Sequence, residues 1–195
     1  MILTLLTPAD YVTTAWSGGT TTQLAIEPAG ALYADRDFLW RISSAKVELE
    51  ESDFTALPDY RRFISTIRGD MTLSHNGGPA LTLRPGDIHC FDGGDQTHSW
   101  GRCTDFNLML RKGAADGSMT ALRIKGETGF RPDRETECAL LYCAAGSAVV
   151  RVGGEEYRLS AGESILVREI SGECLRLDGA GGTLILAVQM RRVRG

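Results

Sequence analysis

The sequence predicts an all-β fold of two small, jelly-roll-like β-barrels. The 195-residue chain contains 23 glycines, which separate short strand-like segments, and no apolar pattern of helical period continues for three turns. A pattern of strands and turns also occurs twice along the chain. A chain of this length can form one large domain or two small ones, and the repetition favours two.

Strand-like segments occur in both halves of the chain. Each is rich in β-branched or aromatic residues and is bounded by Gly, Pro, Asp or Ser. The clearest are residues 38–47 (FLWRISSAKV), 62–67 (RFISTI), 106–110 (FNLML) and 183–190 (TLILAVQM). Residues 111–118 (RKGAADGS) are polar and contain glycine, so we expect a linker there.

The repeated pattern consists of a strand, a Gly-Gly hairpin, a strand, a Gly-acid turn and a strand. It is seen in residues 77–91 (GGPALTLRPGDIHCF) and again in residues 153–167 (GGEEYRLSAGESILV). Upstream, residues 67–73 resemble residues 145–150, one residue out of step. We expect both Gly-Gly pairs to supply the positive φ that tight hairpins require. Two unrelated hairpins are the alternative, but a repeat of this length suits a duplicated barrel.

The linker predicts a first barrel of residues 1–115 and a shorter second barrel of residues 116–195. The second segment is short for a closed barrel. An amino-terminal strand could therefore cross over to complete it, so that the two barrels exchange a strand.

Composition excludes several classes of protein. The net charge of -4, from 21 basic and 25 acidic residues, gives no basic footprint for nucleic acid or an anionic membrane. No apolar run approaches the roughly 20 residues of a membrane span, and the amino terminus has no signal-peptide pattern. The five cysteines form no C-x-x-C pair, as is typical of reduced thiols. We therefore expect a cytoplasmic protein.

Several short motifs together point to one family. They are residues 16–21 (WSGGTT) followed by Glu27-Pro28, residues 38–43 (FLWRIS), residues 53–58 (DFTALP) with Arg61-Arg62, and residues 105–109 (DFNLM). In this order and at this spacing, the chain resembles the HutD/Ves family of bacterial bicupins along nearly its whole length. Asp59 departs from the family, which commonly has Gly at this position.

The resemblance implies a double cupin, or bicupin, with a regulatory or accessory role. Such proteins are often encoded among histidine-utilisation genes. Their implied role is to bind a small metabolite, such as formylglutamate, without an established reaction. The second half of the chain matches mainly as a cupin repeat, so the resemblance adds little about its function.

The histidines do not form the usual cupin metal motif. Such a site needs about three histidines and a carboxylate, beginning with His-x-His. Here His75 precedes a hairpin, where we expect it to be solvated, His98 lies in a polar segment that we interpret as a loop, and His89 follows the Pro-Gly-Asp turn. The matching strand of the second repeat offers only Ile165 and Leu166. We expect no metal, and a structural role for His89.

Two strands combine a polar face with an apolar one, because alternate residues of a strand face the same way. Arg41 and Ser43 share one face, and Asp105 and Asn107 share another. From patterning alone these faces could equally point to water. Because they fall on the family motifs, we expect them to line a pocket.

A pocket of this composition suits an acidic ligand. A guanidinium pairs bidentately with a carboxylate, so Arg41, aided by Ser43, is the leading candidate and Arg62 the second. Asn107 can donate and accept hydrogen bonds, and Asp105 could orient an arginine or accept an amide N–H. Arg62 could instead form a surface ion pair with Asp59 or Asp53.

The mouth of the pocket is expected at residues 16–21. Trp16 would supply an aromatic wall, and Thr20 would lie with the close backbone amides of the Gly-Gly segment. Trp16 could equally close the end of the barrel as a core residue. Tyr60 is either a pocket wall or an exposed turn residue.

The sequence therefore predicts a metal-independent protein that binds a small carboxylate metabolite, with no cofactor, no nucleic acid and no membrane. The chain could also form a homodimer. The alternative is a cupin enzyme, either a metal-free isomerase or lyase that uses Asp105 as a base or a metal-dependent oxygenase that uses His89. The absence of an evident acid–base pair favours the binding protein.

Overall fold

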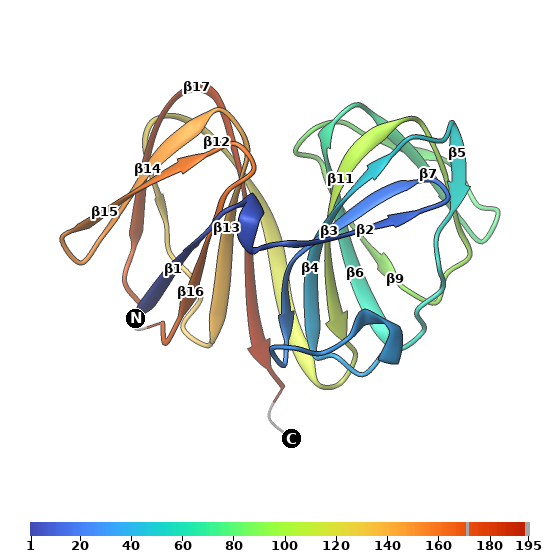
Figure 1. Ribbon diagram of the computed structural model, residues 1–195, viewed down its shortest axis with the longest axis horizontal. Coiled ribbons are helices and arrows are strands. Elements are labelled where there is room, and N and C mark those ends of the chain that lie inside the picture. Colours follow the sequence, from blue (N-terminus) through green and yellow to red (C-terminus); the bar gives the residue numbers. More distant parts are fainter. Residues whose placement is uncertain (171, 194–195) are drawn as a thin grey trace. The chain divides into compact units, whose positions relative to one another are not determined.

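The computed structural model describes residues 1–170 and 172–193, and it divides the chain into two compact units. We call Tyr11–Asp116 with Val193 the first barrel, and Met1–Asp10 with Gly117–Arg192 the second barrel. Both units are built of β-strands (Figure 1). The predicted all-β fold is confirmed.

The first barrel consists of two sheets. In spatial order, one contains β2 (Val12–Trp16), β3 (Gly19–Glu27), β4 (Trp40–Val47), β11 (Cys103–Arg111), β6 (Tyr60–Arg68) and β9 (Ile88–Asp92). The other contains β5 (Glu51–Asp53), β10 (Thr97–Trp100), β7 (Met71–His75) and β8 (Leu81–Leu83). A short 3-10 turn, η2 (Tyr33–Asp35), lies between β3 and β4 in the chain.

The second barrel is formed by one continuous set of paired strands. Their spatial order is β1 (Ile2–Leu6), β16 (Ser164–Arg168), β13 (Cys138–Ala145), β17 (Leu175–Arg192), β14 (Ser147–Val152) and β15 (Glu155–Ser160). The long strand β12 (Ala115–Phe130) also pairs with β17, and the 3-10 turn η1 (Pro8–Asp10) follows β1. The expected strands at residues 38–47, 62–67, 106–110 and 183–190 fall on β4, β6, β11 and β17.

The strand pairing supports a duplication. In the first barrel β6 pairs with β9 and β11, and in the second barrel β13 pairs with β16 and β17. The two halves of β17 pair with β14 and β13, as β10 and β11 separately pair with β7 and β6. The two repeats therefore share their pairing scheme as well as their turn residues.

The first hairpin corrects the predicted Gly-Gly turn. Asn76 and Gly77 adopt φ of 53° and 70°, whereas in the second repeat Gly153 and Gly154 adopt 57° and 86°. An Asn-Gly pair is favoured in such a two-residue turn because asparagine tolerates the left-handed region. The two hairpins therefore differ by one residue in the alignment, which explains why the segments upstream of them are out of step.

The amino-terminal strand completes the second barrel. All five residues of β1 pair with β16, from Ile2 opposite Arg168 to Leu6 opposite Ser164. Residues 1–10 thus belong to the second barrel and not to the first, where we expected them, and residues 2–6 pair with β16.

The expected linker at residues 111–118 is mostly not a loop. Arg111 ends β11, a tight turn covers residues 112–114, and β12 starts at Ala115. Backbone pairing along β12 continues through this polar segment, and the boundary between the units falls within that strand, after Asp116.

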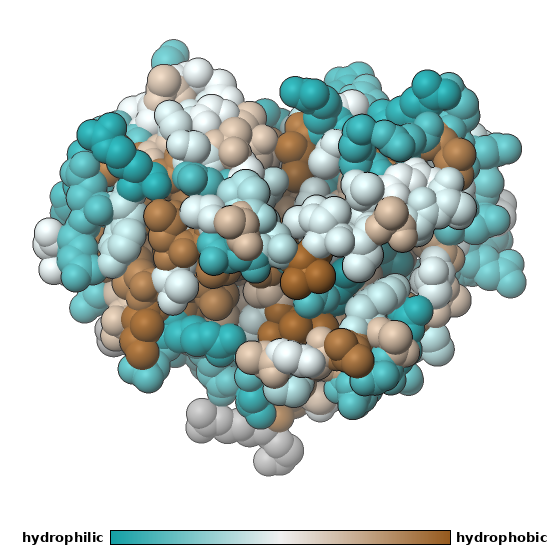
Figure 2. Space-filling view, viewed as in Figure 1, coloured by the Kyte–Doolittle hydropathy of each residue, from teal (hydrophilic) through white to brown (hydrophobic). Residues whose placement is uncertain are grey.

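Polar and apolar residues are interspersed on the face shown in Figure 2. The exposed large hydrophobic residues are dispersed along the sequence, and they include Val12, Trp16, Leu49 and Trp100 of the first barrel. In the part of the chain that the structure describes, no helix is long and apolar enough to cross a membrane.

Candidate functional site

The first barrel encloses a cavity of about 320 Å³, a size within the range of small-molecule sites. Its walls come from β2, β3, β4, β6 and β11, together with β5 and the residues after it. The lining residues are Thr14, Trp16, Thr21, Tyr33, Arg41, Ser43, Ala45, Val47, Ser52, Asp53, Phe54, Thr55, Arg62, Asp105, Asn107 and Met109.

Strand register brings the polar residues together. Asn107 of β11 lies opposite Ser43 of β4, and Met109 lies opposite both Arg41 of β4 and Arg62 of β6. Since cross-strand partners project to the same face of a sheet, these residues face the cavity as one surface. Arg41 and Arg62 are each only 6% exposed, so the polar faces do not point to water.

Arg41 is held by neutral partners. Its Nε donates to Gln23 Oε1 at 2.8 Å, and its Nη1 donates to Ser43 Oγ at 3.1 Å. The guanidinium carbon lies 4.3 Å from the centre of the Tyr33 ring, a cation–π contact. Burial lowers the pKa of Arg41, because a low-dielectric surrounding disfavours the charged form.

Arg62, Asn107 and Asp105 form a hydrogen-bonded chain. Arg62 Nη2 donates to Asn107 Oδ1 at 2.9 Å, and Asn107 Nδ2 donates to Asp105 Oδ1 at 2.8 Å. The backbone N–H of Ala45 also donates to Asp105 Oδ1, at 3.2 Å. Asn107 therefore connects the cation to the carboxyl group, with its amide orientation set by its two partners.

The two ionisable groups of this network, Arg62 and Asp105, have strongly shifted pKa values. Burial lowers the pKa of Arg62 to about 10 and raises the pKa of Asp105 to about 6. Hydrogen bonds from Asn107 and Ala45 oppose the change at Asp105. Arg62 Nε is buried without a hydrogen-bond partner. Among residues 1–170 and 172–193, neither Arg41 nor Arg62 has an ion-pair partner, so the expected alternative of a surface pair with Asp59 or Asp53 is wrong for Arg62.

Trp16 lines the cavity, and Thr20 does not. Trp16 is 41% exposed, which fits a wall at the mouth better than a core residue. Its indole packs over Gly18, where an added Cβ would clash with the ring. On β3 the neighbouring Thr21 faces the cavity, because successive residues of a strand point to opposite faces.

The sequence analysis did not identify three residues that contact the two arginines. Gln23 and Tyr33 anchor Arg41, and Phe54 lies 4.8 Å from the Arg62 guanidinium, measured to the ring centre. Phe54 falls within the DFTALP motif, which could have indicated it. Tyr33 lies in a short 3-10 turn with no motif. Tyr60 is neither wall nor exposed residue, since it is buried and donates to the carbonyls of Arg36 and Phe38.

His75 and His89 form a pair outside the cavity lining. Their Nε2 atoms lie 2.9 Å apart, and His75 Nδ1 lies 2.8 Å from Thr97 Oγ1. His75 is half-buried on β7, where we expected a solvated residue. Within the described residues no third His, Cys, Asp or Glu joins them in a metal-binding group. The residues present therefore do not fit the metal centre of a cupin, which needs more ligands.

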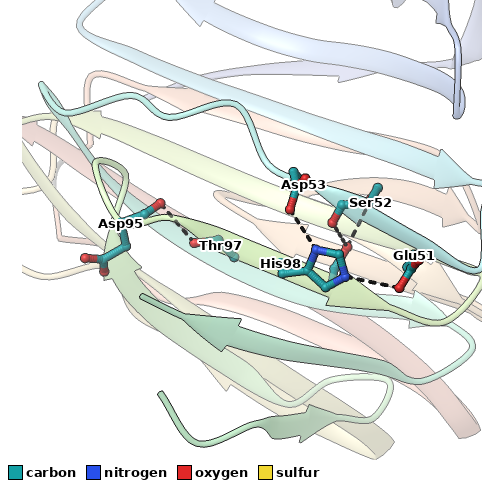
Figure 3. A network of polar contacts seen from close by, with 7 residues as sticks. Glu51, Ser52, Asp53, Asp95, Thr97 and His98 are labelled. Carbon is teal, nitrogen blue, oxygen red and sulfur yellow. Dashed lines mark hydrogen bonds and ion pairs between the residues drawn. The ribbon is translucent and has the colours of Figure 1, made fainter. Parts of the chain in front are cut away.

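His98 lies on strand β10 rather than in the expected loop. Its Nδ1 lies 2.7 Å from Asp53 Oδ1, and its Nε2 lies 3.4 Å from Glu51 Oε2. Figure 3 shows the ring between the two carboxylates, both of which come from β5. The hydrogen bond with Asp53 raises the pKa of His98. This contact joins β5, which lines the cavity, to β10, the strand with which it pairs.

Solved structures similar to this chain share its fold. A conserved protein of unknown function from Pseudomonas aeruginosa is 24% identical, with a TM-score of 0.86 over 98% of this chain and 100% of that one. HutD from Pseudomonas fluorescens, in a formate condition, is 24% identical, with a TM-score of 0.81 over 100% of both chains. A bacterial pirin from Escherichia coli, in complex with nickel(II), is 9% identical, with a TM-score of 0.68 over 98% of this chain and 100% of that one. None of the curated proteins compared with the chain matches it.

Two duplicated barrels, the first of them with a cavity that contains buried polar side chains, define a double cupin. The chain belongs to the HutD family, whose model matches residues 8–185. This membership agrees with the resemblance found in the sequence and supports the expected association with histidine utilisation.

Proposed function

We propose that the first barrel is a cytoplasmic, metal-independent binding site for a small carboxylate metabolite. The role would be regulatory or accessory in histidine utilisation, with a formylglutamate-like compound as the ligand. The family supports the pathway, and the chemistry of the cavity supports the ligand class.

The observation that carries the proposal is the pair of buried arginines without ion-pair partners. Buried charged side chains are normally paired, because an unpaired charge loses its hydration without compensation. Arg41 and Arg62 line one cavity, and within the described residues their hydrogen bonds go to neutral groups. A carboxylate that enters the cavity would supply the missing negative charge.

The remaining groups would orient the ligand. Gln23, Ser43 and Tyr33 hold the Arg41 guanidinium in place, which lowers the entropy lost when a ligand binds. The walls also contain Trp16, Phe54 and Met109, which could cover an aliphatic segment of the ligand. Thr20 has no part in this proposal, since Thr21 takes its expected place.

The test is calorimetry of the wild-type protein with formylglutamate, glutamate, urocanate and formate. A charge-assisted hydrogen bond contributes about 1.5–3 kcal/mol, so Arg41→Ala should weaken binding of the best ligand by roughly ten-fold to more than a hundred-fold. Arg41→Lys should recover only part of the loss, because an ammonium lacks the planar donor fork.

His89→Ala is the matched control, since His89 lies in the same barrel but not in the cavity lining. It should change the affinity by no more than a few-fold. Equal affinities of wild type and Arg41→Ala would remove Arg41 from the site. Stoichiometric iron, manganese, nickel or zinc in protein purified without an affinity tag would instead favour a metal enzyme.

Asp105 favours a second candidate, a metal-free isomerase or lyase. Its carboxyl group is buried in the cavity, and its raised pKa of about 6 is suited to proton transfer. In deuterated water, such an enzyme would exchange a carbon-bound hydrogen of its ligand or convert the ligand, and NMR would detect both. Binding without exchange or turnover would leave the binding protein as the function.

A further inference from the structure

Asp105 places a carboxyl group inside a cavity that otherwise suits an anion. It is 3% exposed and makes no direct ion pair among the described residues. Oδ1 accepts both of its hydrogen bonds, from Ala45 and Asn107, and Oδ2 accepts none from the part of the chain that the structure describes. A ligand carboxylate would thus meet a second carboxylate in the same low-dielectric space.

The two carboxylates would depend on the same positive charges. Asp105 already interacts with Arg62 through Asn107. With Asp105 ionised, the three buried charged groups of the lining, Arg41, Arg62 and Asp105, carry one net positive charge, and with Asp105 neutral they carry two. The carboxylate of Asp53, which also lines the cavity, is exposed to solvent and contacts His98. With Asp105 ionised, the net charge of the three buried groups balances that of a monocarboxylate. The charge of a dicarboxylate is balanced only after Asp105 gains a proton.

We propose that Asp105 takes up a proton when the first barrel binds a dicarboxylate, so that binding strengthens as the pH falls. This inference rests on the proposed function and adds a regulatory property to the same site. The linkage follows from electrostatics, because a like charge nearby favours the neutral form of a buried carboxyl group. A monocarboxylate should show a weaker linkage, since it leaves the cavity closer to neutral.

The groups around Asp105 support this assignment. Arg62 acts on it from β6, the Ala45 N–H donates to it from β4, and Asn107 donates to it from its own strand. Arg41 lines the same cavity from β4. Cys103 has a pKa raised to about 12 by burial and by Asp105, so it stays neutral. Burial raises the pKa of Asp105 to about 6, and the acid is therefore mostly ionised at neutral pH and ready to accept a proton.

Two other titrating groups must be separated from Asp105. His98 contacts Asp53, which lines the cavity, and the pKa of His75 is lowered by burial and by the charge of Arg62. Asp105→Asn removes the titrating group while its carbonyl oxygen can still accept from Ala45 and Asn107. Any pH dependence that persists in this variant belongs to the histidines.

The experiment is calorimetry with formylglutamate and formate from about pH 5 to about pH 8, in buffers of different ionisation enthalpy. Wild type should bind formylglutamate about ten-fold more tightly near pH 5 than near pH 8. Each unit by which the bound ligand raises the pKa of Asp105 corresponds to a factor of ten in affinity. Near neutral pH it should take up a fraction of a proton. Asp105→Asn should show no uptake, a flat profile and, near pH 8, tighter binding than wild type.

The outcomes separate this inference from the proposed function. Binding of formylglutamate to wild type without proton uptake, or with the same uptake in Asp105→Asn, would overturn the linkage and leave the binding site intact. Failure of wild type to bind any probe at any pH would overturn the proposed function, and the linkage with it.

Discussion

The two barrels share a pairing scheme but are filled differently. In the second barrel, the strand pair β13–β17 directs Leu141 and Ala187 into a continuous apolar cluster. In the first barrel, the corresponding pair β6–β11 directs Arg62 and Asn107 toward a cavity. Two apolar clusters of the first barrel, one around Ile64 and one around Phe38, are smaller, and a member of each (Val47 and Met109) also lines the cavity.

This difference suggests a division of roles after duplication. Burial of apolar side chains stabilises the second barrel, whereas burial of charge in the first barrel opposes folding unless a ligand compensates it. Sites built for binding commonly sacrifice stability in this way. We therefore expect substitutions in the second barrel to alter stability, and substitutions in the first to alter binding.

The largest expected effect is a loss of stability caused by a substitution in the second barrel. Leu141 is completely buried in the apolar cluster, so Leu141→Ala should lower the free energy of unfolding by about 2–5 kcal/mol. Chemical denaturation measures the loss. At temperatures where the variant stays folded, its affinity for formylglutamate should equal that of wild type, and a large loss of affinity would contradict the division of roles.

A smaller effect is expected in the cavity, where Arg62 donates to Asn107 and is the cation near Asp105. Arg62→Met keeps apolar contact with Phe54 and Phe91 but leaves Asn107 Oδ1 without its donor, so it should lower the free energy of unfolding by about 1–3 kcal/mol. It should also weaken carboxylate binding, because a positive charge is lost from the cavity. Calorimetry and chemical denaturation measure the two effects, and an unchanged affinity would remove Arg62 from the site.

The smallest effect concerns the strand at the edge of the cavity. His98 has a raised pKa because of Asp53, so its stabilising contribution is present below the unfolded-state value near 6.5 and is lost as the pH rises through the folded-state value. His98→Gln should therefore lower the melting temperature slightly near pH 6 and leave it unchanged near pH 9. Thermal unfolding of both proteins across this range is the measurement, and an equal difference at both ends would exclude the charge effect.

Much of this arrangement could be predicted from residues alone. Turn glycines and alternating strands indicate the duplicated barrels, and strand periodicity places Arg41 with Ser43 and Asp105 with Asn107 on common faces. These pairs do line one cavity. The prediction of Thr20 was off by one residue, because in a strand a shift of one position reverses the face.

The remainder depends on contacts between distant segments. Nothing local indicates that Tyr33 stacks on Arg41 or that His75 meets His89, since these contacts arise only when strands and turns come together. The prediction of a linker at residues 111–118 was wrong for a related reason. Backbone pairing with a neighbouring strand can hold a polar, glycine-containing segment in extended form, and local composition does not reveal that partner.

The most direct test of the central claim is a crystal structure of the protein with formylglutamate bound. We predict a ligand carboxylate in the cavity of the first barrel, with an oxygen about 2.7–2.9 Å from a guanidinium nitrogen of Arg41 or Arg62. The apolar interior of the second barrel should contain no ligand. A ligand bound elsewhere, or an empty cavity at saturating concentration with Arg41 still bonded only to Gln23 and Ser43, would contradict the account.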